Sequence, residues 1–202
     1  MGIPKRPRAL WLAVGVVLLG VAAVSAQVSL VQGHPLGQGS TSSSFGLGSS
    51  CDGFEPTTTM ARCNEVAFVP GSAVGLGFSV RNNGPVPLTI VAVKGLGNES
   101  PMTLAELNPV LPPAGGPWDV TFAFDGARPI QPIDLAPGQD GAIQFVGRMR
   151  TCDAVHGHWS PGVGMRFDRA RLTVRVLAMS SEIDVPLQQA LQINSPEAGA
   201  CP

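Results

Sequence analysis

The sequence predicts an all-β domain, an antiparallel β-sandwich of about seven strands. Apolar and polar residues alternate over several short stretches, as they do in strands that bury one face. Glycine (25 residues) and proline (19 residues) are abundant, which indicates frequent turns between those stretches. No internal repeat and no regular exchange of strands with helices is present, so a parallel nucleotide-binding sheet is not expected.

The strands are expected where the alternation is clearest. In the stretch that ends at Asn82, the side chains of Leu76, Phe78 and Val80 point to one side and those of Ser79 and Arg81 to the other. Residues 86–94 are apolar on both faces, as in a strand covered on both sides. The further strands are expected at residues 65–69, 118–124, 140–150, 169–179 and 182–193.

Turn residues separate these strands. Asn82-Asn83-Gly84-Pro85 combines a glycine that tolerates positive φ with a proline that cannot donate to a sheet. Pro137-Gly138 predicts a second corner, directly before an alternating strand. Thr103 and Glu106 have the spacing of a capping box, which predicts one short helical turn on the sandwich.

The N-terminus has the character of a membrane-directed segment. Lys5, Arg6 and Arg8 precede an uncharged apolar run from Ala9 to Ala26, and basic residues on that side keep the N-terminus in the cytoplasm. Residues 1–26 are therefore a single-pass anchor or a signal peptide cleaved after Val24-Ser25-Ala26. Apolar residues that continue beyond Ala26 favour the anchor, which places the domain at the cell membrane on its outer side; cleavage would make it a secreted protein.

Composition divides the rest of the chain into a linker and a domain. Residues 27–50 are rich in Gly and Ser and have no hydrophobic period, which predicts a flexible linker. Residues 51–202 are long enough to form one domain with its own core. With a net charge of −1 the chain lacks the basic surface that nucleic-acid binding requires.

The four cysteines predict two disulfides formed after export. None belongs to a Cys-x-x-Cys pair of the kind that zinc sites use, and four cysteines allow three pairings. Cys51 and Cys63 bracket one short loop, so they are expected to pair with each other. Cys152 would then pair with Cys201 and fasten the C-terminal tail.

Two stretches resemble a known family of domains. "FSVRNNGPVPLTI" (78–90) and "DLAPGQDGAIQF" (134–145) are similar to bacterial extracytoplasmic immunoglobulin-like and fibronectin-type-III-like domains. The resemblance covers residues 66–193 and implies an immunoglobulin-like sandwich. The Cys, Trp and Cys arrangement of antibody domains is missing, and the resemblance implies little about chemistry because such sandwiches serve many functions.

One loop suggests a metal site. His156 and His158 are two residues apart, so in an extended segment both would project to the same side, and Met149 and Met165 flank them in the sequence. Imidazole and thioether groups together suit Cu(I). A copper site at these four residues is the alternative to an ordinary polar loop without a cofactor.

The expected function is that of a non-catalytic binding or structural module. The nucleophile elbow, the phosphate-binding loop and the His-Glu-x-x-His zinc motif are all missing, and the carboxylates are scattered over turns. We therefore expect a protein or cell-envelope component as the partner, reached outside the cytoplasm. An extracytoplasmic copper-binding protein and a hydrolase with an unrecognised site are the alternatives.

Overall fold

The structure is a computed structural model. It describes residues 16–17, 20, 33, 35–45, 48–51, 55–58, 60–96, 104–112, 128–155 and 164–195. Within these ranges, no helix is both long and apolar enough to cross a bilayer. The predicted anchor or signal peptide at residues 1–26 lies almost entirely outside the described residues.

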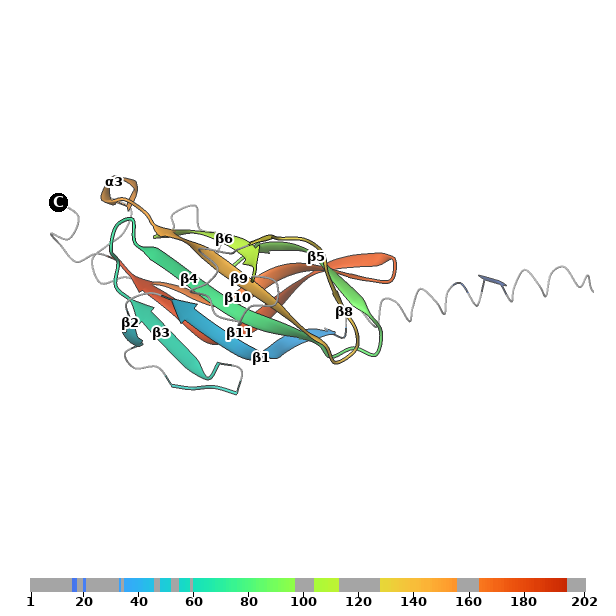
Figure 1. The fold of residues 1–202 in the computed structure, drawn as a ribbon. Helices are drawn as coiled ribbons and strands as arrows, with labels where there is room; N and C mark the ends of the chain where they lie inside the picture. The colour runs from blue at the N-terminus through green and yellow to red at the C-terminus, as the bar shows by residue number, and fades with distance from the viewer. Residues whose placement is uncertain are drawn as a thin grey trace, which may run out of the picture.

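The described residues form two sheets packed face to face, which confirms the predicted all-β sandwich (Figure 1). One sheet has the strand order β1-β4-β9-β6-β7. Its strands are β1 (Leu36–Phe45), β4 (Ala73–Asn82), β6 (Ala105–Leu111), β7 (Arg128–Pro129) and β9 (Asp140–Met149).

The second sheet has the order β2-β3-β11-β10-β5-β8, and its pairs are antiparallel except for β3 and β11, which run parallel. Its strands are β2 (Gly48–Ser50), β3 (Arg62–Val66), β5 (Leu88–Gly95), β8 (Ile133–Leu135), β10 (Gly164–Val176) and β11 (Met179–Asn194). One short helix, α3 (Cys152–Val155), follows β9.

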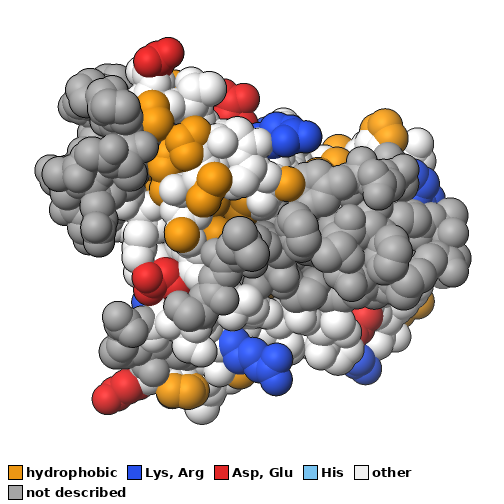
Figure 2. Space-filling model, turned by 60° about the vertical axis from the view of Figure 1, so that its left-hand side comes forward, with side chains coloured by type: hydrophobic (Ala, Val, Ile, Leu, Met, Phe, Trp, Pro, Cys, Tyr) orange, Lys and Arg blue, Asp and Glu red, His pale blue; other side chains and the backbone are white. Residues whose placement is uncertain are grey.

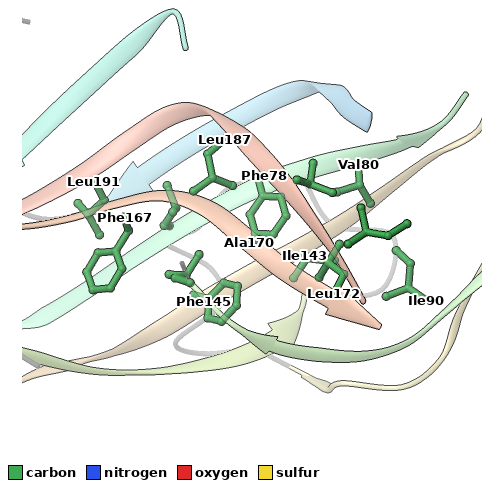
Figure 3. Packing of buried hydrophobic residues seen from close by; sticks show 14 of the residues in the cluster. Phe78, Val80, Ile90, Ile143, Phe145, Phe167, Ala170, Leu172, Leu187 and Leu191 are labelled. Atoms are coloured by element: carbon green, nitrogen blue, oxygen red, sulfur yellow. The ribbon is translucent and has the colours of Figure 1, made fainter. Parts of the chain in front are cut away.

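The core lies between the sheets and contains the side chains that the alternation predicted. Phe78 of β4 and Phe145 of β9 stack with their ring centroids 6.1 Å apart. Leu172 of β10 and Leu191 of β11 approach from the other sheet, and all four are buried in one cluster (Figure 3). Alternation in these strands therefore identified the buried face correctly.

The two predicted turns meet at one corner. The side chain of Asn82, fully buried, donates to the carbonyls of Val86 and Leu135 (2.9 and 3.0 Å) and accepts from the backbone N–H of Gly84. Asn82 N–H donates to the Gln139 carbonyl (3.0 Å). Gly84 is required for close approach, because an added Cβ would lie 2.9 Å from the Pro35 side chain.

The second turn has the geometry that its sequence indicates. Gly138 has a φ of +75°, which the Pro137-Gly138 pair allows without strain. Its N–H donates to the carbonyl of Asn82 at 2.7 Å, so the turn before β9 is tied directly to the end of β4.

The prediction of a linker over residues 27–50 is wrong for β1 and β2. β1 pairs with β4 from Leu36 to Phe45, with an irregularity between Gln38 and Ser42. Gly39 is needed there, because a Cβ at this position would come within 2.8 Å of the Ser79 backbone carbon. The sandwich therefore begins at Leu36 and includes a strand whose composition resembles a linker.

The short helical turn predicted from the spacing of Thr103 and Glu106 is wrong at Glu106. Glu106 lies in β6, where it pairs with Arg148 of β9 and forms an ion pair with Arg150 (3.3 Å). Hydrogen bonding between β6 and the edge of β9 outweighs the local preference for a helix that the capping pattern indicates. Thr103 and the predicted strand at 118–124 lie outside the described residues.

Candidate functional site

The β10–β11 hairpin carries the most unusual backbone conformation among the described residues. Val176 pairs with Met179, so Leu177 and Ala178 form a two-residue turn. Leu177 has a φ of +54°, in the left-handed region that normally takes glycine at the first position of such a turn. A leucine in this conformation costs about 1–2 kcal/mol, so the fold keeps a strained residue here.

The strained leucine is exposed. Leu177 is 56% accessible to solvent, although it is a large apolar side chain. The hairpin projects beyond the neighbouring strands at one end of the sandwich (Figure 1). Backbone strain and an exposed apolar side chain therefore coincide at Leu177, which makes this turn a candidate site.

An open hollow of about 920 Å³ lies beside this turn. Its walls come from the hairpin, the start of β5 and the segment around β8. They are formed by Pro87, Leu88, Thr89, Asp134, Leu135, Ala136, Gln139, Arg175, Leu177 and Ala178. We call this surface the hairpin hollow.

The hairpin hollow carries one charge of each sign. Thr89 is the register partner of both Arg175 in β10 and Asp134 in β8, so the three residues form a row across the sheet. The Thr89 hydroxyl donates to the carboxylate of Asp134 at 2.7 Å, and the side chains of Arg175 and Asp134 are exposed. The row therefore offers a cation and a fixed carboxylate to a ligand.

A second polar cluster holds β1 in place. Ser79 donates to the Thr41 carbonyl (3.2 Å) and accepts from the Thr41 N–H (2.9 Å). Asp140 accepts hydrogen bonds from the N–H and hydroxyl of Ser40 and from Arg81. Partial burial alone would raise the pKa of Asp140, but the Ser40 hydrogen bonds and the charge of Arg81 outweigh it, and the pKa is lowered from 3.8. All of these hydrogen bonds join β1 to its neighbours or the neighbours to each other, so we assign the cluster the role of attaching β1 to the sheet.

The structure tests one of the two predicted disulfides. Cys51 and Cys63 are bonded, and their sulfur atoms pack with Ala190 of β11 in a small apolar cluster. This pairing is confirmed. Cys152 also takes part in a disulfide, but its predicted partner Cys201 lies outside the described residues, so that pairing stays a prediction.

The predicted copper ligands have different outcomes. Met149 and Met165 are both buried in the main core, where their side chains pack with apolar neighbours. His156 and His158 lie outside the described residues. Within the described part of the chain, no group of three or more His, Cys, Asp or Glu side chains could share a metal ion.

The sequence reasoning missed the hairpin hollow. Residues 169–179 were expected to form one strand, because "VLAM" contains no Gly, Asn or Asp to signal a turn. The pairing of Val176 with Met179 and the positive φ of Leu177 reveal the turn in the structure. On the face drawn in Figure 2, described basic and acidic side chains are scattered among uncharged ones, so no charged patch points to a site there.

Comparisons with known proteins add little. No protein-family model matches the chain, and no curated protein is detectably similar. It resembles the VesB protease of Vibrio cholerae (TM-score 0.33, 10% identity), covering 66% of this chain but 30% of the protease. It also resembles the CooA pilin subunit from enterotoxigenic Escherichia coli (TM-score 0.30, 10% identity), covering 78% of this chain and 99% of the pilin. Similarity this weak carries no inference about function.

Proposed function

We propose that the chain is a non-catalytic binding module outside the cytoplasm, and that the hairpin hollow is its binding surface. The observation that carries the proposal is Leu177, which is exposed, apolar and held at positive φ. Natural sequences rarely keep such a residue where glycine would relieve the strain, unless the side chain has a role. The adjacent Arg175 and Asp134 supply polar contacts that would orient a partner.

The extracytoplasmic location is supported by two features. The Cys51–Cys63 disulfide suits an oxidising compartment. The basic residues before the apolar run at 9–26 favour an N-terminus inside and a domain outside. The domain is then a cell-membrane protein with a single anchor, or a secreted one if the run is cleaved.

We further propose that the sandwich is of the immunoglobulin-like or fibronectin-type-III-like type. The two stretches that carry this resemblance meet in space, since Asn82 and Gly138 are directly hydrogen-bonded through their backbones. A corner built from both stretches supports this assignment.

The copper and hydrolase alternatives have weaker support. Met149 and Met165 already fill the core, so a copper site would need to draw at least one of them out of apolar packing. For a hydrolase, Ser40 contacts the carboxylate of Asp140, but this carboxylate also accepts from Arg81 in the cluster that attaches β1.

Photo-crosslinking in the native envelope tests the proposal. A benzophenone amino acid replaces Gln139, which is exposed at the edge of the hairpin hollow, or Val69, which is 45% exposed on the loop before β4. We expect discrete adducts from position 139 that disappear in Arg175→Glu and return in Arg175→Lys. Equal adducts from both positions, or none from position 139, would contradict a binding role for this surface.

A further inference from the structure

The hairpin tip lies at the same end of the sandwich as the N-terminal start of the domain. Leu36, the first residue of β1, pairs with Asn82, whose side chain bonds the carbonyl of Leu135. Leu135 pairs with Leu88, which in turn pairs with Val176, directly before Leu177. These contacts link the two sheets at one level along their strands, so Leu36 and Leu177 lie at the same end of the sandwich.

The tether is short compared with the domain. Even fully extended, the residues between Ala26 and Leu36 span no more than about 30–35 Å. A strand of 13 residues, such as β10, is itself about 43 Å long. An apolar run that anchors the chain in a membrane therefore keeps Leu36, and the end of the sandwich that it shares with Leu177, within about 30–35 Å of the bilayer.

The side chains at this end match the layers of a membrane surface. Leu177 is at the tip, and Arg175 lies two residues behind it, which is about 6–7 Å along a strand. Interfacial protein segments bury their apolar groups about 5–10 Å into the boundary between headgroups and acyl chains. With Leu177 at that depth, the guanidinium of Arg175 would lie at the level of the phosphates.

The charges of the hairpin hollow suit a zwitterionic headgroup. Arg175 would contact the phosphate, while Asp134, oriented by Thr89, would accept from the ammonium of a phosphoethanolamine group. Because the pair is neutral in sum, binding would not require anionic lipid.

We propose that the hairpin hollow is a membrane-docking surface, in which Leu177 enters the bilayer interface and Arg175 and Asp134 bind a zwitterionic phospholipid headgroup. This inference rests on the proposed function and names the partner of the same surface. A single leucine binds weakly by itself, but a short tether raises its effective concentration at the membrane to about the millimolar range. The strain at Leu177 then has a reason, because glycine would give the same turn without an apolar tip.

The test uses the full chain in vesicles of phosphatidylethanolamine and phosphatidylcholine. A benzophenone amino acid replaces Leu177 or, as the control, Val69, and lipid adducts are identified by mass spectrometry. We expect lipid adducts at least tenfold more abundant from position 177 than from position 69, and unchanged when anionic lipid is added. Equal labelling, no lipid adduct at 177, or a chain that does not float with the vesicles would overturn the inference.

Further variants separate docking from folding. With a benzophenone at Gln139, Leu177→Gly should raise the unfolding temperature, since the strain is relieved, and still lower lipid labelling severalfold. Arg175→Glu should lower labelling and Arg175→Lys should restore it. Protein adducts at position 139 in the native envelope, with no lipid adduct at 177 in vesicles, would leave the proposed binding module standing and remove the membrane as its partner. No adduct at either position would remove both.

Discussion

Strands β1 and β9 lie on either side of β4 in the same sheet, yet they are held by different forces. β9 inserts Ile143 and Phe145 into the core, and its alternation was visible in the sequence. In β1 the run from Gly37 to Ser44 consists of Gly, Gln, Ser and Thr, and its backbone and hydroxyl groups bond to Ser79 and Asp140 of its neighbours. An edge strand can thus be specified by residues of other strands, while a central strand must carry its own apolar face.

Among the changes that test this comparison, the largest loss of stability is expected from truncating a core side chain of β9. Phe145→Ala should lower the free energy of unfolding by about 3–5 kcal/mol, because it leaves a cavity beside Phe78. Urea denaturation of residues 35–202 measures the loss. Val146→Ala, on the outward face of the same strand, is the control and should cost much less; equal losses would mean that the burial of β9 has been misassigned.

Removing the polar support of β1 should have a smaller effect. Ser79→Ala deletes the hydroxyl that bonds both the N–H and the carbonyl of Thr41, and should cost about 1–3 kcal/mol. Hydrogen exchange should show β1 amides exchanging faster while β9 stays protected. Ser180→Ala, at an exposed position, should change stability by less than about 0.5 kcal/mol. Unchanged exchange in β1 would show that its hydrogen bonds to Ser79 do not hold it.

Buried polar groups stabilise a fold only when they are hydrogen-bonded. β9 contains a buried polar side chain that is not bonded in this way to any described residue. The side chain of Gln144 is fully buried, and within the described part of the chain neither its amide nitrogen nor its oxygen has a hydrogen-bond partner. Gln144→Met keeps the volume, removes both unsatisfied atoms and should raise the free energy of unfolding by about 1–2 kcal/mol. A higher denaturation midpoint with an unchanged urea dependence is the expected result; a lower midpoint would contradict it.

The smallest change in stability is expected from removing the charge of Asp140, which accepts hydrogen bonds from β1. Because the folded pKa of Asp140 is lowered, its ionised form contributes stability at neutral pH that is lost as the pH falls below about 4. Asp140→Asn should destabilise by less than about 1 kcal/mol at pH 7, since the ion pair with Arg81 is partly exposed. The difference between the variant and the parent chain should shrink and then disappear as the pH falls progressively below 3.8. A difference that persists there would assign the effect to packing instead of charge.

The sequence was informative where a strand buries its own face. β10 and most of β11 alternate buried and less buried side chains as the sequence does, and the Asn82 corner follows from its turn residues. β4 buries its predicted core face, but Gly77 and Ser79 on its other face are buried as well. β1 could not be recognised from its composition, because its hydrogen-bond partners lie about 40 and 100 residues away. The capping pattern at Glu106 was equally misleading, because the local signal gives way to pairing with β9.

The candidate site was less predictable than the fold. A turn of Leu and Ala carries none of the usual turn residues, so its position emerges only once Val176 and Met179 are seen to pair. The methionines proposed as copper ligands were singled out by their place in the sequence, but their burial depends on which way β9 and β10 face the core. Pairing and burial depend on the whole sandwich, and single stretches do not encode them.

The parallel pairing of β3 with β11 has a consequence for the order of folding. Residues 62–66 find their partners only at residues 189–193, near the other end of the domain. Because a chain is synthesised from its N-terminus, β3 stays without this partner until the last described strand, β11, has been made. Contacts this distant in sequence slow folding and lengthen the time for which an open edge is exposed. Cys51 and Cys63 are close enough to bond during that interval, which would give β2 and β3 a defined shape before β11 arrives.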